Sequence, residues 1–170
     1  MLLSELLRLD SLSGTRVVSD GANLDRQVRW VHVVDLPDPR PWVKPEQLLL
    51  TTGVSLSASQ EERREFVRHV HQAGVAALAL AVPMHFDHFP DDMVEEAKGL
   101  GLPLLEIPWE IPFVEITEEV HQALTAQKNQ LIQRSEEIHR LLTKASVTRR
   151  SLSDLVLMLG ELLHRSVIIE

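Results

Sequence analysis

The 170-residue sequence contains no cysteine. That absence excludes a disulfide scaffold, a thiolate metal site and a cysteine nucleophile, and it is compatible with a reducing compartment. Long apolar runs are also missing, because the longest, residues 75–82, has the length of a strand and falls short of the ~18 residues that a membrane-spanning helix requires. The sequence therefore predicts a cytoplasmic protein that does not span a membrane.

Basic clusters are missing as well. The chain has 25 Asp and Glu against 17 Lys and Arg, which gives a formal net charge of −8, and no block of basic residues offsets that charge locally. A surface of this charge repels the phosphate backbone of nucleic acids. We therefore expect this chain to bind DNA poorly on its own.

The usual catalytic signatures are absent: there is no G-x-S-x-G elbow, no Gly-rich phosphate loop and no H-E-x-x-H. The best enzymatic lead is the segment from His85 to His88, where two histidines and Asp87 could bind a divalent metal. Its spacing is unspecific, since polar surface loops carry the same residues. We predict no catalytic residue, no metal site and no cofactor, and a metal-dependent enzyme that uses His85, His88 and a glutamate stays open as an alternative.

Short apolar segments alternate with amphipathic ones through the first two thirds of the chain. Parallel strands need crossover connections, so this alternation predicts a parallel sheet covered by helices. We predict an α/β fold, with a small Rossmann-like parallel sheet that has a mixed edge, flanking helices and a long C-terminal helix. The expected strands are 15–19, 28–36, 47–53, 75–82 and 102–107, and the expected helices are 60–73, which starts with a capping box of Ser59 and Glu62, and a helix between Pro90 and Gly101.

Polar or aromatic residues follow four of the predicted strands. In an open parallel sheet, ligands bind beyond the carboxyl ends of the strands, near a switch in strand order. The alternative is that the threonines only end a strand and that the three tryptophans, at positions 30, 42 and 109, fill the core. The predicted ligand-binding residues are Asp35, Thr51, Thr52, Gly53, His85 and Trp109.

Residues 113 to about 147 contain no glycine or proline and are rich in helix formers, which predicts one long helix. Apolar residues recur along it with a heptad period, as in helices that pair with a second copy. Gln127 and Arg134 interrupt the pattern and keep the seam weak and adjustable. The predicted dimerisation residues are Val120, Leu124, Leu131, Ile138 and Leu141.

Several separated motifs resemble one known family in their order along the chain. They are GANLDRQVRWVH at 21–32, DLPDP at 35–39, QLLLTTG at 47–53, and LPLLEIP at 102–108 followed by IPF at 111–113. Together they resemble the amino-terminal domain of the purine catabolism regulator (PucR) family, over residues 1 to about 125. The resemblance implies a bacterial transcription regulator whose amino-terminal domain senses a metabolite, such as a purine, a ureide or an amino acid, and whose carboxyl-terminal helix-turn-helix binds DNA.

The expected organisation follows from these patterns. Residues 1–112 are expected to form the sensing domain, 113–150 the connector and dimerisation helix, and 151–170 the start of a truncated following domain. No segment of this sequence looks like a helix-turn-helix, so DNA is expected to be bound by a part that this chain lacks. The competing interpretation is a structural dimerisation scaffold that binds no ligand.

Overall fold

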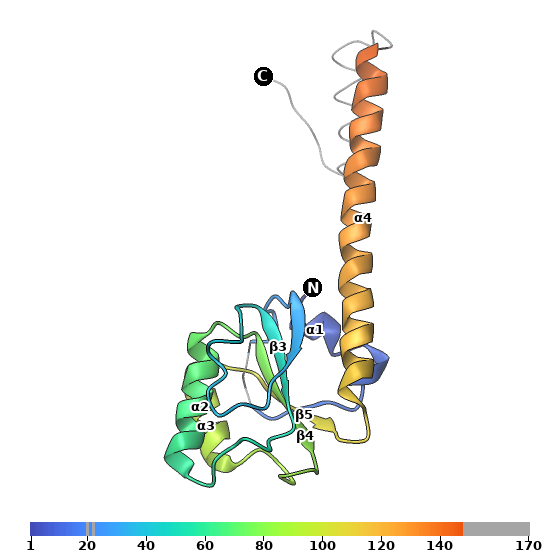
Figure 1. Cartoon of the computed structure of the whole chain (residues 1–170). Coiled ribbons are helices and arrows are strands. Elements are labelled where there is room, and N and C mark those ends of the chain that lie inside the picture. The colour runs from blue at the N-terminus through green and yellow to red at the C-terminus, as the bar shows by residue number, and fades with distance from the viewer. Residues whose placement is uncertain (20, 22, 148–170) are drawn as a thin grey trace. The chain divides into compact units, whose positions relative to one another are not determined.

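A computed structural model describes residues 1–19, 21 and 23–147 (Figure 1). The chain divides into two compact units, Met1–Leu124 and Thr125–Glu170. The first unit contains the sheet, and helix α4 (Phe113–Val147) begins in it. Residues 151–170, which are expected to begin a following domain, lie outside the described residues.

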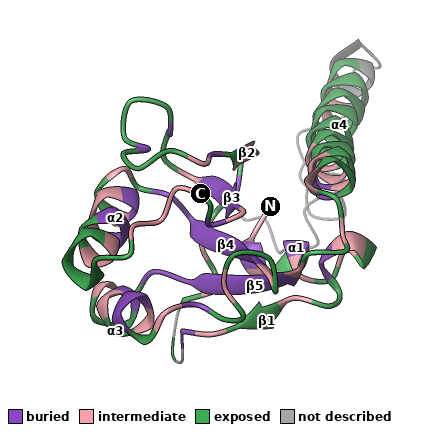
Figure 2. Cartoon of the chain, turned by 60° about the horizontal axis from the view of Figure 1, so that its bottom comes forward, coloured by how far each residue is buried: buried purple, intermediate pink, exposed green. Residues whose placement is uncertain are grey.

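The sheet has five strands in the order β1-β5-β4-β3-β2. Strands β2 to β5 are parallel, and β1 pairs antiparallel with β5 at one edge. This confirms the predicted α/β fold and its mixed edge. The inner strands are drawn almost wholly as buried in Figure 2, as their continuous apolar sequences require. The strands are β1 (Arg16–Val17), β2 (Trp30–Val33), β3 (Gln47–Thr51), β4 (Ala77–Val82) and β5 (Leu104–Pro108).

Helices cover both faces of the sheet (Figure 1). Helices α2 (Gln60–Gln72) and α3 (Asp91–Leu100) lie side by side on one face, where they pack on Leu49 of β3. Helix α1 (Leu3–Leu6), a 3-10 turn (Asp10–Leu12) and the start of α4 lie on the other, where Leu48 and Leu50 point. Neighbouring residues of a strand face opposite sides, so one short strand supplies both cores.

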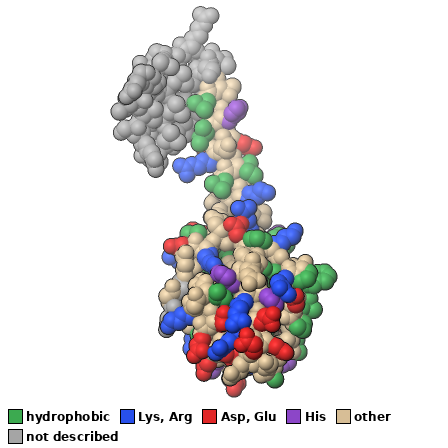
Figure 3. Space-filling view, turned by 90° about the vertical axis from the view of Figure 1, so that its left-hand side faces the viewer, with side chains coloured by type: hydrophobic (Ala, Val, Ile, Leu, Met, Phe, Trp, Pro, Cys, Tyr) green, Lys and Arg blue, Asp and Glu red, His purple; other side chains and the backbone are tan. Residues whose placement is uncertain are grey.

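The two helices on the first face are tied together by charge. Arg63 of α2 donates to both carboxylate oxygens of Asp92 on α3, at 3.0 and 2.7 Å, and both side chains are nearly buried. Arg68 makes a second pair of hydrogen bonds to Glu96 at 2.9 and 3.1 Å. The outer surface of this face accordingly shows acidic and basic side chains intermixed (Figure 3).

The starts of the helices differ in detail from what the sequence predicts. Ser59 is the N-cap of α2, but its side chain makes no capping hydrogen bond, and its N–H donates instead to the Ser57 hydroxyl oxygen at 3.0 Å. The predicted capping box with Glu62 is therefore wrong, and Glu62 is left for other contacts. Pro90 is the N-cap of α3 rather than part of its first turn, and Gly101, at φ 64°, ends that helix in the left-handed conformation.

The first three turns of α4 belong to the α/β unit. Ile116 and Val120 are fully buried in its core, and Leu124 packs against them. His121 lies edge-on to Trp30 of β2, with ring centroids 4.5 Å apart and an interplanar angle of 88°. Val120, which the heptad pattern assigns to dimerisation, is thus covered by its own unit.

Candidate functional site

Four of the six predicted ligand-binding residues come together where β2 and β3 end. One oxygen of the Asp35 carboxylate accepts hydrogen bonds from the Thr51 hydroxyl at 2.6 Å and the Thr52 N–H at 2.9 Å, and the other accepts from the Thr52 hydroxyl at 2.8 Å. The Thr51 hydroxyl oxygen also accepts from the N–H of Gly53 at 3.1 Å. We call these four residues the Asp35 cluster. Its polar groups pair with one another, and their effect is to join the ends of the two strands.

Gly53 brings a third strand end beside the cluster. Its φ is 83°, and a Cβ atom built on it would lie 3.0 Å from both Leu80 of β4 and Phe86 of the following loop. Only glycine fits this combination of a left-handed backbone and close neighbours. The loop that contains His85 therefore packs beside Gly53, although the His85 side chain itself is exposed.

Trp109 follows β5, and its backbone N–H donates to the carbonyl oxygen of Val82 at 2.9 Å. The residue is nevertheless 53% exposed. Trp30 and Trp42 are 49% and 64% exposed, so the alternative in which the three tryptophans fill the core is wrong. The order β5-β4-β3-β2 also runs consecutively, so these parallel strands contain no reversal in strand order. The crevice that such a reversal opens in doubly wound sheets has no counterpart here.

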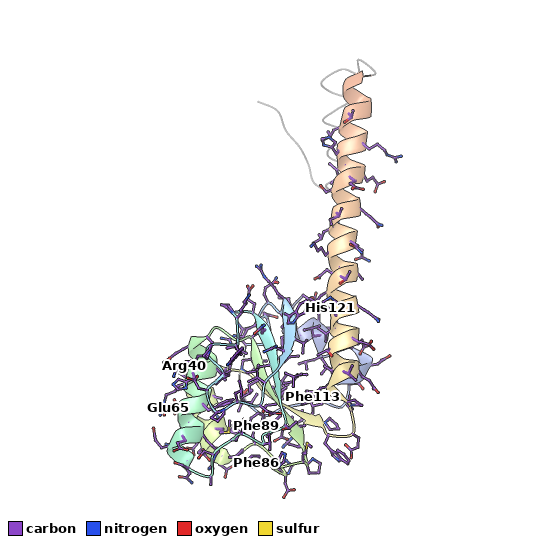
Figure 4. The ribbon with its side chains drawn as sticks, viewed as in Figure 1. Arg40, Glu65, Phe86, Phe89, Phe113 and His121 are labelled. Carbon is purple, nitrogen blue, oxygen red and sulfur yellow. The ribbon has the colours of Figure 1, made fainter. Side chains whose placement is uncertain are left out.

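A hollow lies beside the loops that follow strands β2 and β3. It is a pocket of about 330 Å³ between the loop after β2, the loop after β3 and the first half of α2. We call it the α2 pocket, and two of its residues, Arg40 and Glu65, lie close together over α2 in Figure 4. The residues that line it are Pro37, Asp38, Arg40, Ser55, Leu56, Ser57, Glu62, Glu65, Phe66 and His69.

The rim of the α2 pocket is charged. Arg40 donates from two guanidinium nitrogens to the two carboxylate oxygens of Asp38, at 2.9 and 2.8 Å. This bidentate hydrogen bond lowers the pKa of Asp38 to about 2. His69 lies between two carboxylates, with Nε2 3.5 Å from Glu65 and Nδ1 4.0 Å from Asp38.

The wall of the pocket holds one unsatisfied polar group. The hydroxyl oxygen of Ser55 is buried and has no hydrogen-bond partner among the described residues. Ser55 comes two residues after Gly53, and Pro37 comes two residues after Asp35. The Asp35 cluster therefore fixes the base of both loops that form the pocket.

Sequence reasoning missed this pocket. Its residues lie in the proline-rich loop after β2 and on the surface of α2, where polar side chains carry no distinctive pattern. The one useful signal in the sequence was the position of the two loops, because the loops that form two walls of the pocket directly follow predicted strands. Glu62 was assigned to a capping box, and that assignment hid its place on the pocket rim.

Glu106, toward the other edge of the sheet, is buried, with only 3% of its surface exposed. It accepts hydrogen bonds from the Phe89 N–H at 2.8 Å and the Arg16 Nε at 3.0 Å, and His88 Nδ1 lies 3.4 Å away. Burial opposes ionisation, but the Phe89 N–H, Arg16 and His88 outweigh it and lower the pKa of Glu106. His88 thus meets a glutamate, as the metal-enzyme alternative requires, but within a group of contacts in which Arg16 of β1 and the loop between β4 and α3 pair with Glu106 of β5.

The lowered pKa of Glu106 predicts a loss of stability in acid. A carboxylate with a depressed folded-state pKa stabilises the fold above its ordinary pKa, and this contribution is lost as the pH falls through the folded value. Urea unfolding followed from neutral pH to pH about 3 should show a smaller pH dependence in Glu106→Gln than in the unmodified chain. Equal pH dependence in the two proteins would contradict this role, and Glu110→Gln, an exposed neighbour, serves as the control.

Within 1–19, 21 and 23–147, no group of three or more His, Asp or Glu residues is arranged to hold a metal ion. No helix in the same part of the chain has the length and apolar character to cross a membrane.

Comparison with known proteins gives consistent matches. The model of the PucR family, described as the purine catabolism regulatory protein-like family, matches residues 5–124. The transcriptional activator PmfR of Paenarthrobacter nicotinovorans is 30% identical over 141 residues, which are 83% of this chain and 30% of that protein. The purine catabolism regulatory protein of Bacillus subtilis (strain 168) is 20% identical over 169 residues, which are 99% of this chain and 32% of that protein. The chain thus spans about a third of the length of these curated relatives.

One solved structure is also similar. It contains the CBS and DRTGG domains of the regulatory region of Clostridium perfringens pyrophosphatase, complexed with the activator diadenosine tetraphosphate. The TM-score is 0.42 at 12% identity, with 70% of this chain and 45% of that chain covered.

Proposed function

This chain belongs to the purine catabolism regulatory protein-like (PucR) family, and on that premise we propose that it is the ligand-sensing and dimerisation module of a bacterial transcription regulator. The regulated process is the catabolism of purines or other nitrogen compounds; the family description and the name of the Bacillus subtilis relative support purines. DNA is bound by a helix-turn-helix in a part of the regulator outside this chain, and the regulator acts in the cytoplasm.

The α2 pocket is the observation that carries the sensing part. It lies between helix α2 and the loops that follow the neighbouring parallel strands β2 and β3. Its volume of about 330 Å³ falls within the range of ~300–1,000 Å³ that is usual for small-molecule sites. The ligand is a metabolite of the size of a purine, a ureide or an amino acid, and the Asp35 cluster holds the loops that receive it.

Strand β2 connects the pocket region with α4. The loop that follows β2 forms one wall of the pocket, and Trp30 at the beginning of β2 contacts His121 of α4. A ligand that binds one arrangement of the loop more tightly shifts the population toward it. The Trp30–His121 contact is the place where such a shift reaches the helix.

Exposed apolar residues of α4 support the dimerisation part. Leu131 is 66% exposed, and Ile138, seven residues further along, is half-buried. Residues seven apart in a helix lie on one face, as in the seam of a coiled coil. Leu141 occupies a further position of the same predicted seam, whereas Leu124 packs on the core of its own α/β unit. A second copy of the chain covers the seam beyond Leu124.

Ligand binding to the pocket is tested by thermal unfolding. Purines, ureides and amino acids are added to the chain and to a Ser55→Leu variant, in which the larger side chain fills the pocket. A ligand at a hundred times its dissociation constant stabilises the native state by about 2.7 kcal/mol, which raises Tm by several degrees. We expect at least one compound to raise the Tm of the unmodified chain and to leave that of Ser55→Leu unchanged. If no compound acts through the pocket, the sensing function is refuted.

The self-pairing of the Asp35 cluster favours a second candidate, a structural dimerisation scaffold without a ligand. The groups of this cluster that were predicted to bind a ligand form hydrogen bonds with one another instead. Such bonds are expected if the cluster only joins the ends of the two strands. Under this second hypothesis, the chain forms a dimer, and no compound in the same screen changes its Tm.

A further inference from the structure

We propose that the ligand of the α2 pocket is an organic cation, a small molecule with a protonated amine that contacts Glu62 and Glu65 and an apolar part that lies on Leu56 and Phe66. This inference rests on the proposed sensing function and adds the charge and shape of the ligand. It is carried by the charges that line the pocket, by the pairing of Arg40 with Asp38, and by the apolar side chains on the inner side of the pocket.

The lining of the pocket has an excess of negative charge. Asp38, Glu62 and Glu65 contribute three carboxylates, and Arg40 is the one Lys or Arg side chain among the lining residues. Arg40 is held by both oxygens of Asp38. Asp38 thus offsets the charge of Arg40, and an anionic ligand would lie beside the carboxylates of Asp38, Glu62 and Glu65. The pocket therefore disfavours anions.

The two carboxylates of α2 on the pocket rim differ in their partners. The side chain of Glu62 makes no hydrogen bond or ion pair among the described residues. Glu65 lies 3.5 Å from His69 and also interacts electrostatically with Arg40. The two glutamates are three residues apart on α2, so their side chains are neighbours on its surface. Like charges in this arrangement repel each other, and a cation between them removes the repulsion. The positive end of α2 does not reverse this preference, because Glu61 and Glu62 both occupy its first turn.

The inner side of the pocket is apolar. Phe66 is 4% exposed and lies on the same face of α2 as Glu62, while Leu56 lines the opposite loop. Ser55 belongs to the same wall, where its hydroxyl oxygen is buried and has no hydrogen-bond partner among the described residues. A site with carboxylates at the rim and an apolar interior fits an amine attached to a ring or a short chain.

Three probes of one shape and different charge test this inference on the whole chain. They are benzylammonium, benzyl alcohol and benzoate, and binding is measured by calorimetry and by the shift in Tm. We expect benzylammonium to bind tightest. Glu62→Gln should weaken it by about 3- to 5-fold, the range for a partly exposed ion pair. Glu61→Gln makes the same charge change one residue away, at a side chain that faces Arg68 rather than the pocket, and should leave the affinity unchanged.

The outcomes separate this inference from the sensing function. If benzoate or benzyl alcohol binds as tightly as benzylammonium, and Ser55→Leu abolishes that binding, the pocket is a ligand site and the preference for a cation is wrong. If Glu61→Gln and Glu62→Gln weaken benzylammonium equally, the effect is one of general charge and the assignment to the rim is overturned. If none of the probes and none of the metabolites binds through the pocket, both proposals fail.

Discussion

Gly53→Ala is expected to lower the free energy of unfolding by about 2–4 kcal/mol, as the sum of the cost of a left-handed backbone and the cost of overpacking. The added Cβ would lie 3.0 Å from Leu80 and from Phe86, and φ is 83°. Both contacts are with side-chain atoms, so the side chains of Leu80 and Phe86 would have to shift to make room. Urea unfolding at neutral pH measures the change.

Gly101→Ala is the matched control for this prediction. Gly101 has a similar φ of 64°, but a Cβ atom there meets nothing within 4 Å. Its replacement should therefore cost only the backbone part, about 1 kcal/mol. If both variants lose the same stability, the contact of Gly53 with Phe86 contributes nothing, and the loop after β4 is not held at the strand ends in the way described.

If α4 pairs two copies as proposed, the double change Leu131→Asp and Ile138→Asp should convert the dimer into a monomer. Each substitution places a charge in the apolar seam, and two copies would then bring four carboxylates together, so the dissociation constant should rise by at least about 100-fold. Sedimentation at tens of micromolar protein measures the oligomeric state. Because Leu131 is exposed and contributes nothing to the core of the α/β unit, the thermal unfolding of that unit should change little.

Val120→Ala tests whether the first turns of α4 serve the core of the α/β unit rather than dimerisation. Val120 is fully buried in the α/β unit, so its truncation should cost about 2 kcal/mol of stability. Association should persist, since a second copy cannot contact a side chain that its own unit covers. A Val120→Ala protein that stays fully stable and becomes monomeric would contradict the assignment of Val120 to the core.

Most strands and helices of this fold could be predicted because the residues within and next to each element indicate it. The run from Gln47 to Gly53 is apolar, of strand length and closed by glycine, and β3 occupies Gln47–Thr51. The convergence of Asp35 with Thr51 and Thr52 could be predicted as well, since parallel strands end at the same edge of a sheet. What these side chains do there could not be predicted, because a hydrogen bond within the cluster and one to a ligand use the same atoms.

The remaining differences arise from tertiary structure. A heptad pattern shows that Val120 and Leu131 lie on one stripe of a helix, but it does not tell whether the same chain or a second copy covers each of them. The α2 pocket depends on where the loop after β2 is placed against α2, and no residue spacing encodes that distance. Glu62 fits a capping box in sequence and lines a pocket in space for the same reason.

The burial of Val120 on the stripe that continues to Leu131 restricts how the length of α4 can vary among related proteins. Each residue inserted into a helix rotates everything beyond it by about 100°. A single insertion between Leu124 and Leu131 would leave the buried turns in place and turn the exposed seam to a different side. Insertions of seven residues change the direction by only ~20°. Relatives in which α4 both packs on its own α/β unit and pairs with a second copy should therefore differ in the length of this segment by multiples of seven residues. Insertions or deletions of one or two residues should be absent from it.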